Sequence, residues 1–312
     1  MKHEGITILL TLFNREFFTR SFLEAYADSK TAMPLLIADS SETNSNCDIV
    51  MLFLKENPTL KIKYTRYKAD TSYNTMLDKF CNALDDIETK YCMFADNDDF
   101  LYYKNIENSI VEFNKDVTMV SGDVHLERCF SKICIHTRVF DKSIEGKDPA
   151  KRIAAHSSNY AELWYSVSET KNKQKIIKKY AHIDIFDINM LYPFYSFEHL
   201  WFGGYKIIPK KFLIRKISDT SIQSSLKDQR MNILLNPEFS KQLSSYIDIF
   251  IKDKDLTREE VIRLFSEVYD QRYFNKYVSL LFKAPIRILF FLKKRINIKR
   301  ITAKQSTPNR SD

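Results

Sequence analysis

The residues best suited to chemistry lie in one short acidic segment near the end of the first third of the chain. Asp96, Asn97, Asp98 and Asp99 follow directly after the apolar segment 91–95. Three carboxylates this close repel one another unless a cation or solvent offsets their charge. Mg²⁺ and Mn²⁺ bind one or two carboxylates and complete their coordination with phosphate oxygens and water. The segment therefore predicts a Mn²⁺ or Mg²⁺ site, with a solvated acidic turn or a helix cap as the alternative.

Two further polar clusters follow apolar segments earlier in the chain. Their candidate residues are Thr11, Asn14 and Arg15 at the end of the apolar segment 6–13, and Asp39 at the end of the segment 34–38. Ligands of open α/β sheets bind beyond the carboxyl ends of the parallel strands. We therefore expect the three polar clusters to lie around one ligand site, provided that the three apolar segments are parallel strands of one sheet.

The stretches around these clusters have the patterns of strands and helices in alternation. Strands are expected at 6–13, 34–38, 60–67, 91–95 and 118–124, and helices at 16–29, 49–55 and 75–87. Strands that alternate with helices are typical of βαβ units and of a mostly parallel sheet. The predicted fold class is therefore α/β, with a mostly parallel sheet flanked by helices.

The second half of the chain has a mainly helical pattern. Helices are expected at 160–168, at 170–181, around Glu198, at 243–250 and from about 257 to 277. Thr257 and Glu260 have the spacing of a capping box at the start of the last helix. We expect one domain over residues 1–218, which holds the sheet and the site, and a helical C-terminal region over residues 219–312.

The composition argues against several classes of protein. The chain has 312 residues, of which 44% are hydrophobic, enough for one large α/β domain or two modest ones. Its five glycines form neither a dinucleotide-binding fingerprint nor a P-loop, and its five cysteines form no C-x-x-C pair. We therefore expect no disulfide framework or structural zinc, and a reducing, cytoplasmic compartment. The N-terminus has the pattern of a strand rather than of a signal peptide, and no membrane-spanning helix is expected.

The positive charge is concentrated at the C-terminus. The formal net charge is +8, yet residues 271–312 hold eleven Lys or Arg and one acidic residue, so the other 270 residues carry a net charge of −2. Apolar side chains alternate with these bases over residues 277–300, a pattern that favours contact with an anionic membrane surface. The alternative is a C-terminal helix that packs on the body with a solvated basic face. We expect no nucleic-acid partner.

The order of the three polar clusters resembles the nucleotide-sugar domain of family 2 glycosyltransferases, which have the GT-A fold. The segments T-L-F-N-R, A-D-S-S and A-D-N-D-D are similar to the family patterns P-T-Y-N-R, D-D-G-S and D-x-D-D. The resemblance covers residues 5–125 and extends more loosely to about residue 218. It departs from the family at Thr11 and Leu12, which replace Pro-Thr or Pro-Val, and at Asp39, where one acid and a glycine are missing.

The resemblance implies a metal-dependent, inverting glycosyltransferase. Its donor would be a UDP-, GDP-, TDP- or CMP-linked sugar, and its acceptor a glycan or a lipid-linked glycan of bacterial envelope polysaccharide synthesis. This places the protein in the cytoplasm, peripheral on the inner face of the cell membrane. Two alternatives are a sugar nucleotidyltransferase, whose Gly-rich basic loop is absent here, and a non-enzymatic membrane- or nucleic-acid-binding module, which leaves the acidic segment unexplained.

The resemblance also implies roles for the residues around the nucleotide. Thr11 and Asn14 would line the base pocket, and Arg15 would close it or pair with Asp39. Asp39 would accept hydrogen bonds from the base or the ribose. The metal would bind to Asp96, which would also touch the ribose, and to Asp98. Asp99 is expected to cap the next helix.

The remaining roles concern transfer to the acceptor. Glu198 lies about a hundred residues after the acidic segment, where the family places an acid at a helix start as catalytic base, and His199 is the rival base. The family motif there is Glu-Asp, whereas this chain has Glu-His. The further candidates are Lys206, Lys210, Lys211, Arg215 and Lys216 for the leaving diphosphate, and His125 and His136 for an acceptor or a third metal ligand.

Overall fold

The computed structural model describes residues 3–130, 133–139, 142–160, 162–183, 190–216 and 237–273. The segment 277–300, predicted to contact a membrane, lies outside these residues, as does the segment 217–236, where the predicted domain boundary falls. None of the helices in the described ranges combines the length and the hydropathy that are needed to cross a bilayer.

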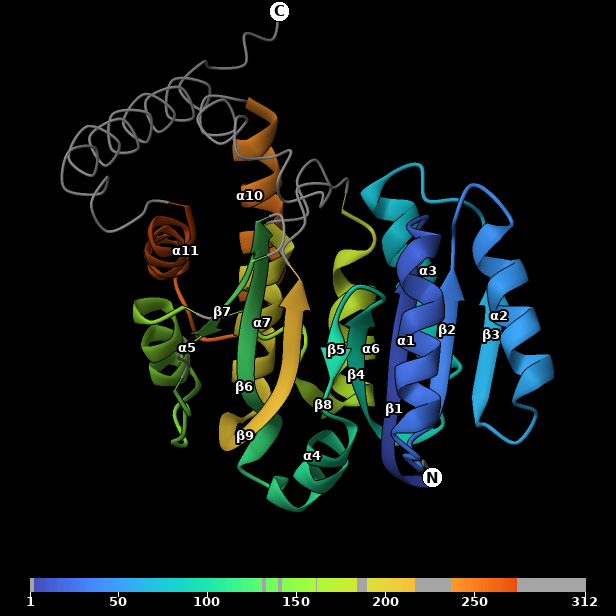
Figure 1. Cartoon of the computed structure of the whole chain (residues 1–312). Coiled ribbons are helices and arrows are strands. Elements are labelled where there is room, and N and C mark those ends of the chain that lie inside the picture. The colour runs from blue at the N-terminus through green and yellow to red at the C-terminus, as the bar shows by residue number, and fades with distance from the viewer. Residues whose placement is uncertain are drawn as a thin grey trace, which may run out of the picture.

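One sheet of nine strands organises the described chain (Figure 1). The strands are β1 (His3–Leu12), β2 (Leu35–Asp39), β3 (Ile62–Arg66), β4 (Thr89–Asp96), β5 (Phe100–Leu101), β6 (Val117–Phe130), β7 (Ile133–Val139), β8 (Val167–Glu169) and β9 (Gly204–Lys216). Their order is β3-β2-β1-β4-β8-β6-β9-β5, with β7 paired to β6. The neighbours from β3 to β4 are parallel, as are β6 and β9, while β8 runs antiparallel to both of its neighbours. The predicted α/β fold with a mostly parallel sheet is confirmed.

Helices cover the two faces of this sheet. They are α1 (Glu16–Asp28), α2 (Ser45–Glu56), α3 (Tyr73–Asp85), α4 (Tyr103–Asn108), α5 (Pro149–Ser158), α6 (Thr170–Tyr180), α7 (Leu191–Phe202), α10 (Pro237–Ile251) and α11 (Arg258–Tyr273), with a 3₁₀ turn at Ser109–Glu112. Helices α1 and α2 pack against each other, and α3, α6, α7 and α10 form a second, continuous layer (Figure 1). The first two crossovers lead from β1 to β2 and from β2 to β3. The third crossover, through α3, returns to the other side of β1, where β4 lies. The order in which strands are added to the sheet therefore reverses between β1 and β4.

The sequence patterns located most of these elements, and the differences have physical causes. The segment 160–168, predicted as a helix, contains a turn and the start of β8, because apolar residues in a short run fit a helix and a buried strand equally well. Residues 204–216 form a strand, β9, that lies between β6 and β5. The capping box is confirmed, since the backbone N–H of Thr257 donates to Glu260 Oε2 at 2.7 Å and the Glu260 N–H donates to Thr257 Oγ1 at 3.2 Å.

Aromatic side chains fill the core beneath the end of β4. Phe94 contacts Phe80 and Trp164, with ring centroids 4.9 and 4.7 Å apart, and Trp164 lies 4.9 Å from Tyr195 of α7. Such pairs add to the stabilisation that comes from burying their area. The polar segment that follows β4 therefore starts from a strand whose side chains pack in the aromatic core.

Candidate functional site

The acidic segment begins at the end of β4, beside the point where the strand order of the sheet reverses. Asp96 is the last residue of β4 and pairs in register with Thr11 of β1, whose other neighbour is Ala38 of β2. Ligands of open α/β sheets bind in the crevice outside the carboxyl ends of the strands at such a switch point. The fold thus brings together Thr11, Asn14, Arg15, Asp39, Asp96 and Asp98, as the sequence predicted.

Side chains from outside the acidic segment bind two of its three carboxylates. Arg15 Nη2 donates to Asp98 Oδ2 and forms an ion pair with it. The hydroxyl of Tyr165 donates to Asp96 Oδ2 at 2.5 Å. The segment itself is a tight turn, because the backbone N–H of Asp99 donates to the carbonyl of Asp96 at 3.3 Å.

Arg215, near the end of β9, supplies a second cation to this cluster. Its Nη2 donates to the Tyr165 hydroxyl at 3.1 Å, and its guanidinium carbon lies 4.2 Å from the centroid of the Tyr165 ring. Burial raises the pKa of Asp96 and of Asp99, and the positive charge of Arg215 opposes the rise for both. The residues of the acidic cluster, defined as Asp96, Asp98 and Asp99, thus lie between two arginines from distant parts of the chain.

Asp99 does not cap the next helix, contrary to the prediction. The cap position of α4 is Tyr102, and no side chain accepts a hydrogen bond there. Instead Asp99 is 8% exposed, and its Oδ2 has no hydrogen-bond partner within the described residues. Burial, together with the charges of Asp96 and Asp98, raises its pKa well above the usual range for Asp. A buried carboxylate oxygen without a donor is costly unless a proton or a cation reaches it.

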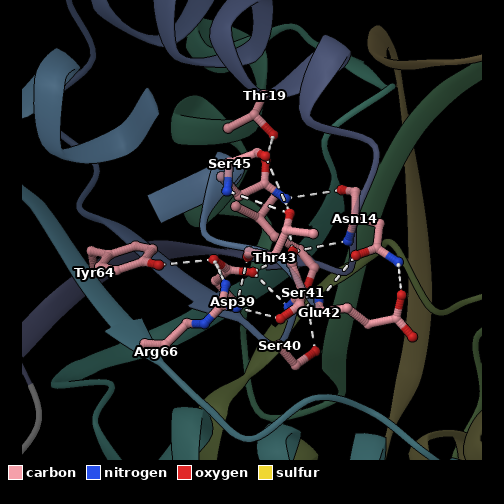
Figure 2. Close-up of polar contacts among 12 residues, drawn as sticks. Asn14, Thr19, Asp39, Ser40, Ser41, Glu42, Thr43, Ser45, Tyr64 and Arg66 are labelled. Atoms are coloured by element: carbon pink, nitrogen blue, oxygen red, sulfur yellow. Dashed lines mark hydrogen bonds and ion pairs between the residues drawn. The ribbon is translucent and has the colours of Figure 1, made fainter. Parts of the chain in front are cut away.

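The turn from β1 to α1 is held in an unusual backbone conformation. Asn14 and Arg15 have φ angles of 54° and 59°, in the left-handed region that few residues other than glycine adopt. Asn97 Nδ2 donates to the carbonyl of Arg15 at 3.0 Å, and Asn46 Nδ2 donates to the carbonyl of Asn14 at 2.9 Å. The Asn14 N–H also donates to Ser41 Oγ at 2.9 Å (Figure 2). Side chains from α2 and from the segments that follow β4 and β2 therefore fix this turn.

Asp39 is fully buried and accepts four hydrogen bonds (Figure 2). Its Oδ1 accepts from the Ser41 N–H at 2.9 Å and the Ser41 hydroxyl at 2.5 Å, and its Oδ2 accepts from Tyr64 at 2.8 Å and Arg66 Nη1 at 2.5 Å. The expected pairing of Arg15 with Asp39 is therefore wrong, because Arg66 occupies that place and Arg15 pairs with Asp98. A carboxylate has about four lone-pair sites, so a nucleobase can bind here only if one donor moves away.

A buried lysine lies next to this network. Lys79 Nζ, on α3, is 2.5 Å from Ser40 Oγ and 2.6 Å from Asp70 Oδ2. Burial lowers the pKa of Lys79, while Asp70, Asp39 and Asp96 oppose that shift. Sequence analysis missed Lys79, Asp70 and Arg66 because none of them belongs to a motif; only the fold brings them to the ends of β2 and β3.

Glu198 does not begin a helix, so its predicted place at a helix start is wrong. It is the eighth residue of α7, in a helix that starts at Leu191. Its Oε1 accepts from Lys179 Nζ at 2.6 Å and from the Tyr180 hydroxyl at 2.9 Å, and Lys254 Nζ lies 2.9 Å from Oε2. None of these partners belongs to the acidic cluster. These contacts tie the Glu198 carboxylate to α6 and to the residues after α10.

His199 is also a core residue. It is fully buried, and neither ring nitrogen has a hydrogen-bond partner in the described ranges. Burial, together with the charge of Lys173, lowers its pKa well below the usual range for His. The ring stays neutral and packs 4.5 Å from the Tyr195 ring centroid. This geometry gives His199 a packing role.

The remaining candidates lie at different places along the sheet. Lys206, at the start of β9, pairs with Glu112 at 2.6 Å. Lys211 Nζ lies 5.8 Å from the Tyr102 ring centroid, and Lys216 Nζ lies 5.9 Å from the Phe18 ring centroid. The basic run consists of Lys206, Lys210, Lys211, Arg215 and Lys216. Within it, Arg215 donates to Tyr165, the partner of Asp96, and its charge acts on Asp96 and Asp99. His125 and His136 belong to the β6–β7 ladder, in register with Arg138 and Glu127.

The acidic cluster suits a hard divalent cation that takes part of its coordination from a ligand. No group of three or more His, Cys, Asp or Glu in the described residues is arranged to hold a metal by itself. Mg²⁺ and Mn²⁺, however, usually take one or two carboxylates and fill the other positions with phosphate oxygens and water. The oxygens of Asp96 and Asp98 and the unpartnered Oδ2 of Asp99 provide donors of this type. The residues therefore fit a cation that binds together with a phosphate ligand.

Comparisons with known proteins give no sequence family but a consistent fold. No family model matches the chain, and no curated protein matches it. The crystal structure of S. aureus TarS 1-349 matches with a TM-score of 0.56 and 12% identity, over 88% of this chain and 74% of that one. Its complex with UDP-GlcNAc matches with a TM-score of 0.56 and 10% identity, over the same shares of both chains. At such identities the likeness shows the fold.

A second solved structure supports the same conclusion. The mannosyltransferase PcManGT from Pyrobaculum calidifontis, in complex with GDP-Man and Mn²⁺, matches with a TM-score of 0.55 and 9% identity, over 95% of this chain and 81% of that one. The sheet and its flanking helices are thus similar to those of glycosyltransferase structures. The GT-A-type fold expected from the three polar clusters is confirmed.

Proposed function

We propose that this chain is a glycosyltransferase that uses a nucleotide sugar as donor and a divalent cation as cofactor. The observation that carries the proposal is the acidic cluster at the β1–β4 switch point, flanked by Arg15 and Arg215, in a fold whose solved neighbours hold UDP-GlcNAc or GDP-Man with Mn²⁺. The arginines can bind the negative charge of a nucleoside diphosphate, and the carboxylates can bind a cation.

The proposed donor site has a nucleoside side and a diphosphate side. Thr11, Asn14 and Asp39, at the ends of β1 and β2, lie on the nucleoside side, and contact of Asp39 with the base requires Tyr64 or Arg66 to move. A UDP- or GDP-linked sugar is the proposed donor, because the solved neighbours bind these two classes. Ser40, Lys79 and Asp70 are further candidates for contact with the base or the ribose.

The diphosphate side is formed by the acidic cluster and the two arginines. Asp96 and Asp98 would hold Mn²⁺ or Mg²⁺, which supplies charge neutralisation to the leaving diphosphate. Tyr165 donates to Asp96 and stacks on Arg215, so it fixes the direction of both side chains. Preorganised cations that face the position of developing negative charge are a major source of rate enhancement. Arg15 and Arg215 are placed for this role.

The proposed transfer is a single in-line displacement. The acceptor hydroxyl oxygen forms a bond to the anomeric carbon while the bond from that carbon to the diphosphate oxygen breaks, which inverts the configuration. The hydroxyl proton is released to water, and the nucleoside diphosphate leaves with the bonding electron pair. We propose a glycan or lipid-linked acceptor of the bacterial envelope, reached from the cytoplasmic membrane face through the basic, apolar segment 277–300. The anomeric configuration of the product, read by NMR, checks the inversion, and liposome co-sedimentation of the full chain with and without residues 275–312 checks the membrane contact.

The central experiment replaces Asp98 by Asn, which keeps the size of the side chain and removes its charge. We expect the full chain to bind UDP or GDP in the presence of Mn²⁺ and the Asp98→Asn variant to bind at least tenfold more weakly, because Asn is a poor ligand for a hard cation. Isothermal titration with UDP, CDP and GDP, with and without Mn²⁺, measures this. Asp85→Asn, in an exposed ion pair with Lys178, is the matched control.

Turnover of sugar nucleotides then separates the proposal from its alternative. A glycosyltransferase releases a nucleoside diphosphate, whereas a sugar nucleotidyltransferase running in reverse consumes pyrophosphate and releases a nucleoside triphosphate. Equal nucleotide affinity of the wild type and Asp98→Asn would remove the acidic cluster from the site. No binding of any nucleoside diphosphate to the wild type would reject the proposed function.

A further inference from the structure

The acidic segment holds the turn between β1 and α1 through two independent contacts. Asn97, its second residue, donates from Nδ2 to the carbonyl of Arg15 at 3.0 Å and to Thr19 Oγ1 at 3.0 Å. Asp98, the next residue, pairs with the guanidinium of the same Arg15. The first contact fixes the backbone of the turn, and the second fixes the side chain.

The backbone contacts keep Arg15 in place whether or not its side chain stays on Asp98. Two successive left-handed residues, Asn14 and Arg15, are costly in free energy and persist only where the surroundings hold them. The amides of Asn97 and Asn46 do so through the two carbonyls of the turn. Neither amide contacts the guanidinium in these hydrogen bonds, so the side chain can leave without loss of the turn.

The side chain of Arg15 is held loosely compared with its partner. Arg15 is 31% exposed, whereas Asp98 is 8% exposed. The Nε of Arg15 is buried and has no hydrogen-bond partner in the described ranges, and its guanidinium carbon lies 5.2 Å from the Phe18 ring centroid. A guanidinium with an open side and few hydrogen bonds can change its position at low cost, while the carboxylate cannot follow it.

Loss of this guanidinium would leave the acidic cluster short of positive charge. Asp99, 8% exposed, already has one buried oxygen without a donor, and the charges of Asp96 and Asp98 act on it. Buried carboxylates that lose a cation either take up a proton or attract another cation. A divalent cation therefore competes with the Arg15 guanidinium for the carboxylate of Asp98.

We propose that Arg15 is the resident counter-ion of Asp98 and is displaced from it when a divalent cation binds, so that its charge becomes available to the donor diphosphate. The inference rests on the proposed function only in its last clause. Competition between Arg15 and the cation can be measured with Mn²⁺ alone. In this account Arg15 is a positioning residue: it holds Asp98 in place before the cation arrives.

The test uses the full chain and the Arg15→Gln variant, without nucleotide. Removal of the competing charge should tighten Mn²⁺ binding about tenfold, the ratio expected when a charge-assisted hydrogen bond no longer has to be broken. The electron paramagnetic resonance signal of free Mn²⁺ measures the affinity. Arg15→Lys, which keeps the charge, should stay within about twofold of the wild type. Arg20→Gln, on the exposed side of α1 and paired with Glu24, is the control.

A measurement on the wild type keeps the proposal testable if Arg15→Gln does not fold. Phenylglyoxal modifies free guanidinium groups, and mass spectrometry of the digested chain gives the extent of modification at Arg15. Mn²⁺ alone should increase this modification, and Mn²⁺ with UDP should decrease it again. Unchanged or weaker Mn²⁺ affinity in a folded Arg15→Gln variant, or protection of Arg15 by Mn²⁺ alone, would overturn the proposal. Absence of binding of UDP, CDP and GDP would reject the proposed function and leave the Mn²⁺ result to stand.

Discussion

At the scale of single residues, the carboxylate of Glu198 shows how a buried charge is kept. Glu198 and Lys254 are 3% and 4% exposed, and Lys179 and the Tyr180 hydroxyl complete the contacts of the carboxylate. Burial lowers the pKa of Lys254 to about 8, although Glu198 opposes the shift. Lys254 follows α10, and Lys179 and Tyr180 end α6, so this one carboxylate connects three helices.

Replacement of Glu198 by Gln should therefore destabilise the fold. Removal of one partner of a buried ion pair leaves an uncompensated charge, at a cost of about 3 kcal/mol in the free energy of unfolding. The unfolded chain binds a proton at Lys254 up to the ordinary lysine pKa, and the folded variant loses it at a lower pH, so stability rises with pH between the two values. The deficit should thus be smaller at pH 9 than at pH 7, as measured by urea unfolding at both pH values.

The same variant separates this structural role from catalysis. A general base at position 198 predicts that Glu198→Gln keeps its stability and loses turnover, whereas the structure predicts lost stability with the turnover of the folded fraction retained. Asp85→Asn, which breaks an exposed ion pair with Lys178, should cost less than 1 kcal/mol and serves as the reference. Full stability of Glu198→Gln at pH 7 would contradict the assigned role.

At the scale of elements, the close pairing of β6 and β9 depends on a glycine. The register of the two strands shifts between Ser121 and Asp123, and Gly122 lies at this irregularity. A Cβ at Gly122 would lie 2.2 Å from the carbonyl oxygen of Lys210 and 2.4 Å from Cδ1 of Phe212. The backbone of a central strand cannot give way by the distance that such a contact needs.

Gly122→Ala should accordingly lower the free energy of unfolding by about 3 kcal/mol, the upper part of the range for overpacking a core. Gly146→Ala is the control, because nothing lies within 4 Å of its Cβ and only its positive φ of 112° opposes a side chain. That strain costs about 1–2 kcal/mol. Thermal unfolding of both variants compares the two terms, and a smaller loss for Gly122→Ala than for Gly146→Ala would show that the strands separate easily.

The elements also show what the sequence patterns can and cannot predict. The strands β1, β2 and β4 are short apolar runs followed by polar clusters, so their ends and the residues Arg15, Asp96 and Asp98 could be read locally. Tyr165 lies in the turn before β8, and Arg215 lies in β9. Both lie beside the acidic cluster, and no local sequence pattern connects them to it. The expected place of Glu198 at a helix start was wrong because the apolar residues of α7 do not mark where the helix starts.

At the scale of the whole molecule, the two described C-terminal helices pack on the helix layer of the sheet domain. Phe194 of α7 stacks with Tyr246 of α10 and with Phe265 of α11, with ring centroids 5.1 and 5.6 Å apart. Helix α11 also packs on α5, and α5 packs on α7. A two-part division of the chain near residue 218 stays a prediction, and the helices on either side of that point share one aromatic core.

This shared layer contains two buried histidines that should make the molecule sensitive to acid. His156 of α5 and His199 of α7 are fully buried, and burial lowers the pKa of His156 to about 3 and that of His199 well below its usual range. In the unfolded chain both rings take up a proton near pH 6.5. Between pH 6.5 and pH 3 the unfolded state therefore binds more protons than the folded state, and stability is lost as the pH falls.

The size of this loss in the free energy of unfolding follows from the titration of the two rings. Each ring contributes about 1.4 kcal/mol per pH unit below pH 6.5, so His156 alone should cost about 2 kcal/mol between pH 6.5 and pH 5. His156→Phe keeps an aromatic ring beside Tyr160, whose ring centroid lies 5.1 Å away, and removes the titration. Its stability, from urea unfolding, should match the wild type at pH 7 and exceed it by about 2 kcal/mol at pH 5. His182→Gln, at an exposed position, is the control, and equal losses in His156→Phe and the wild type would mean that the acid sensitivity arises elsewhere.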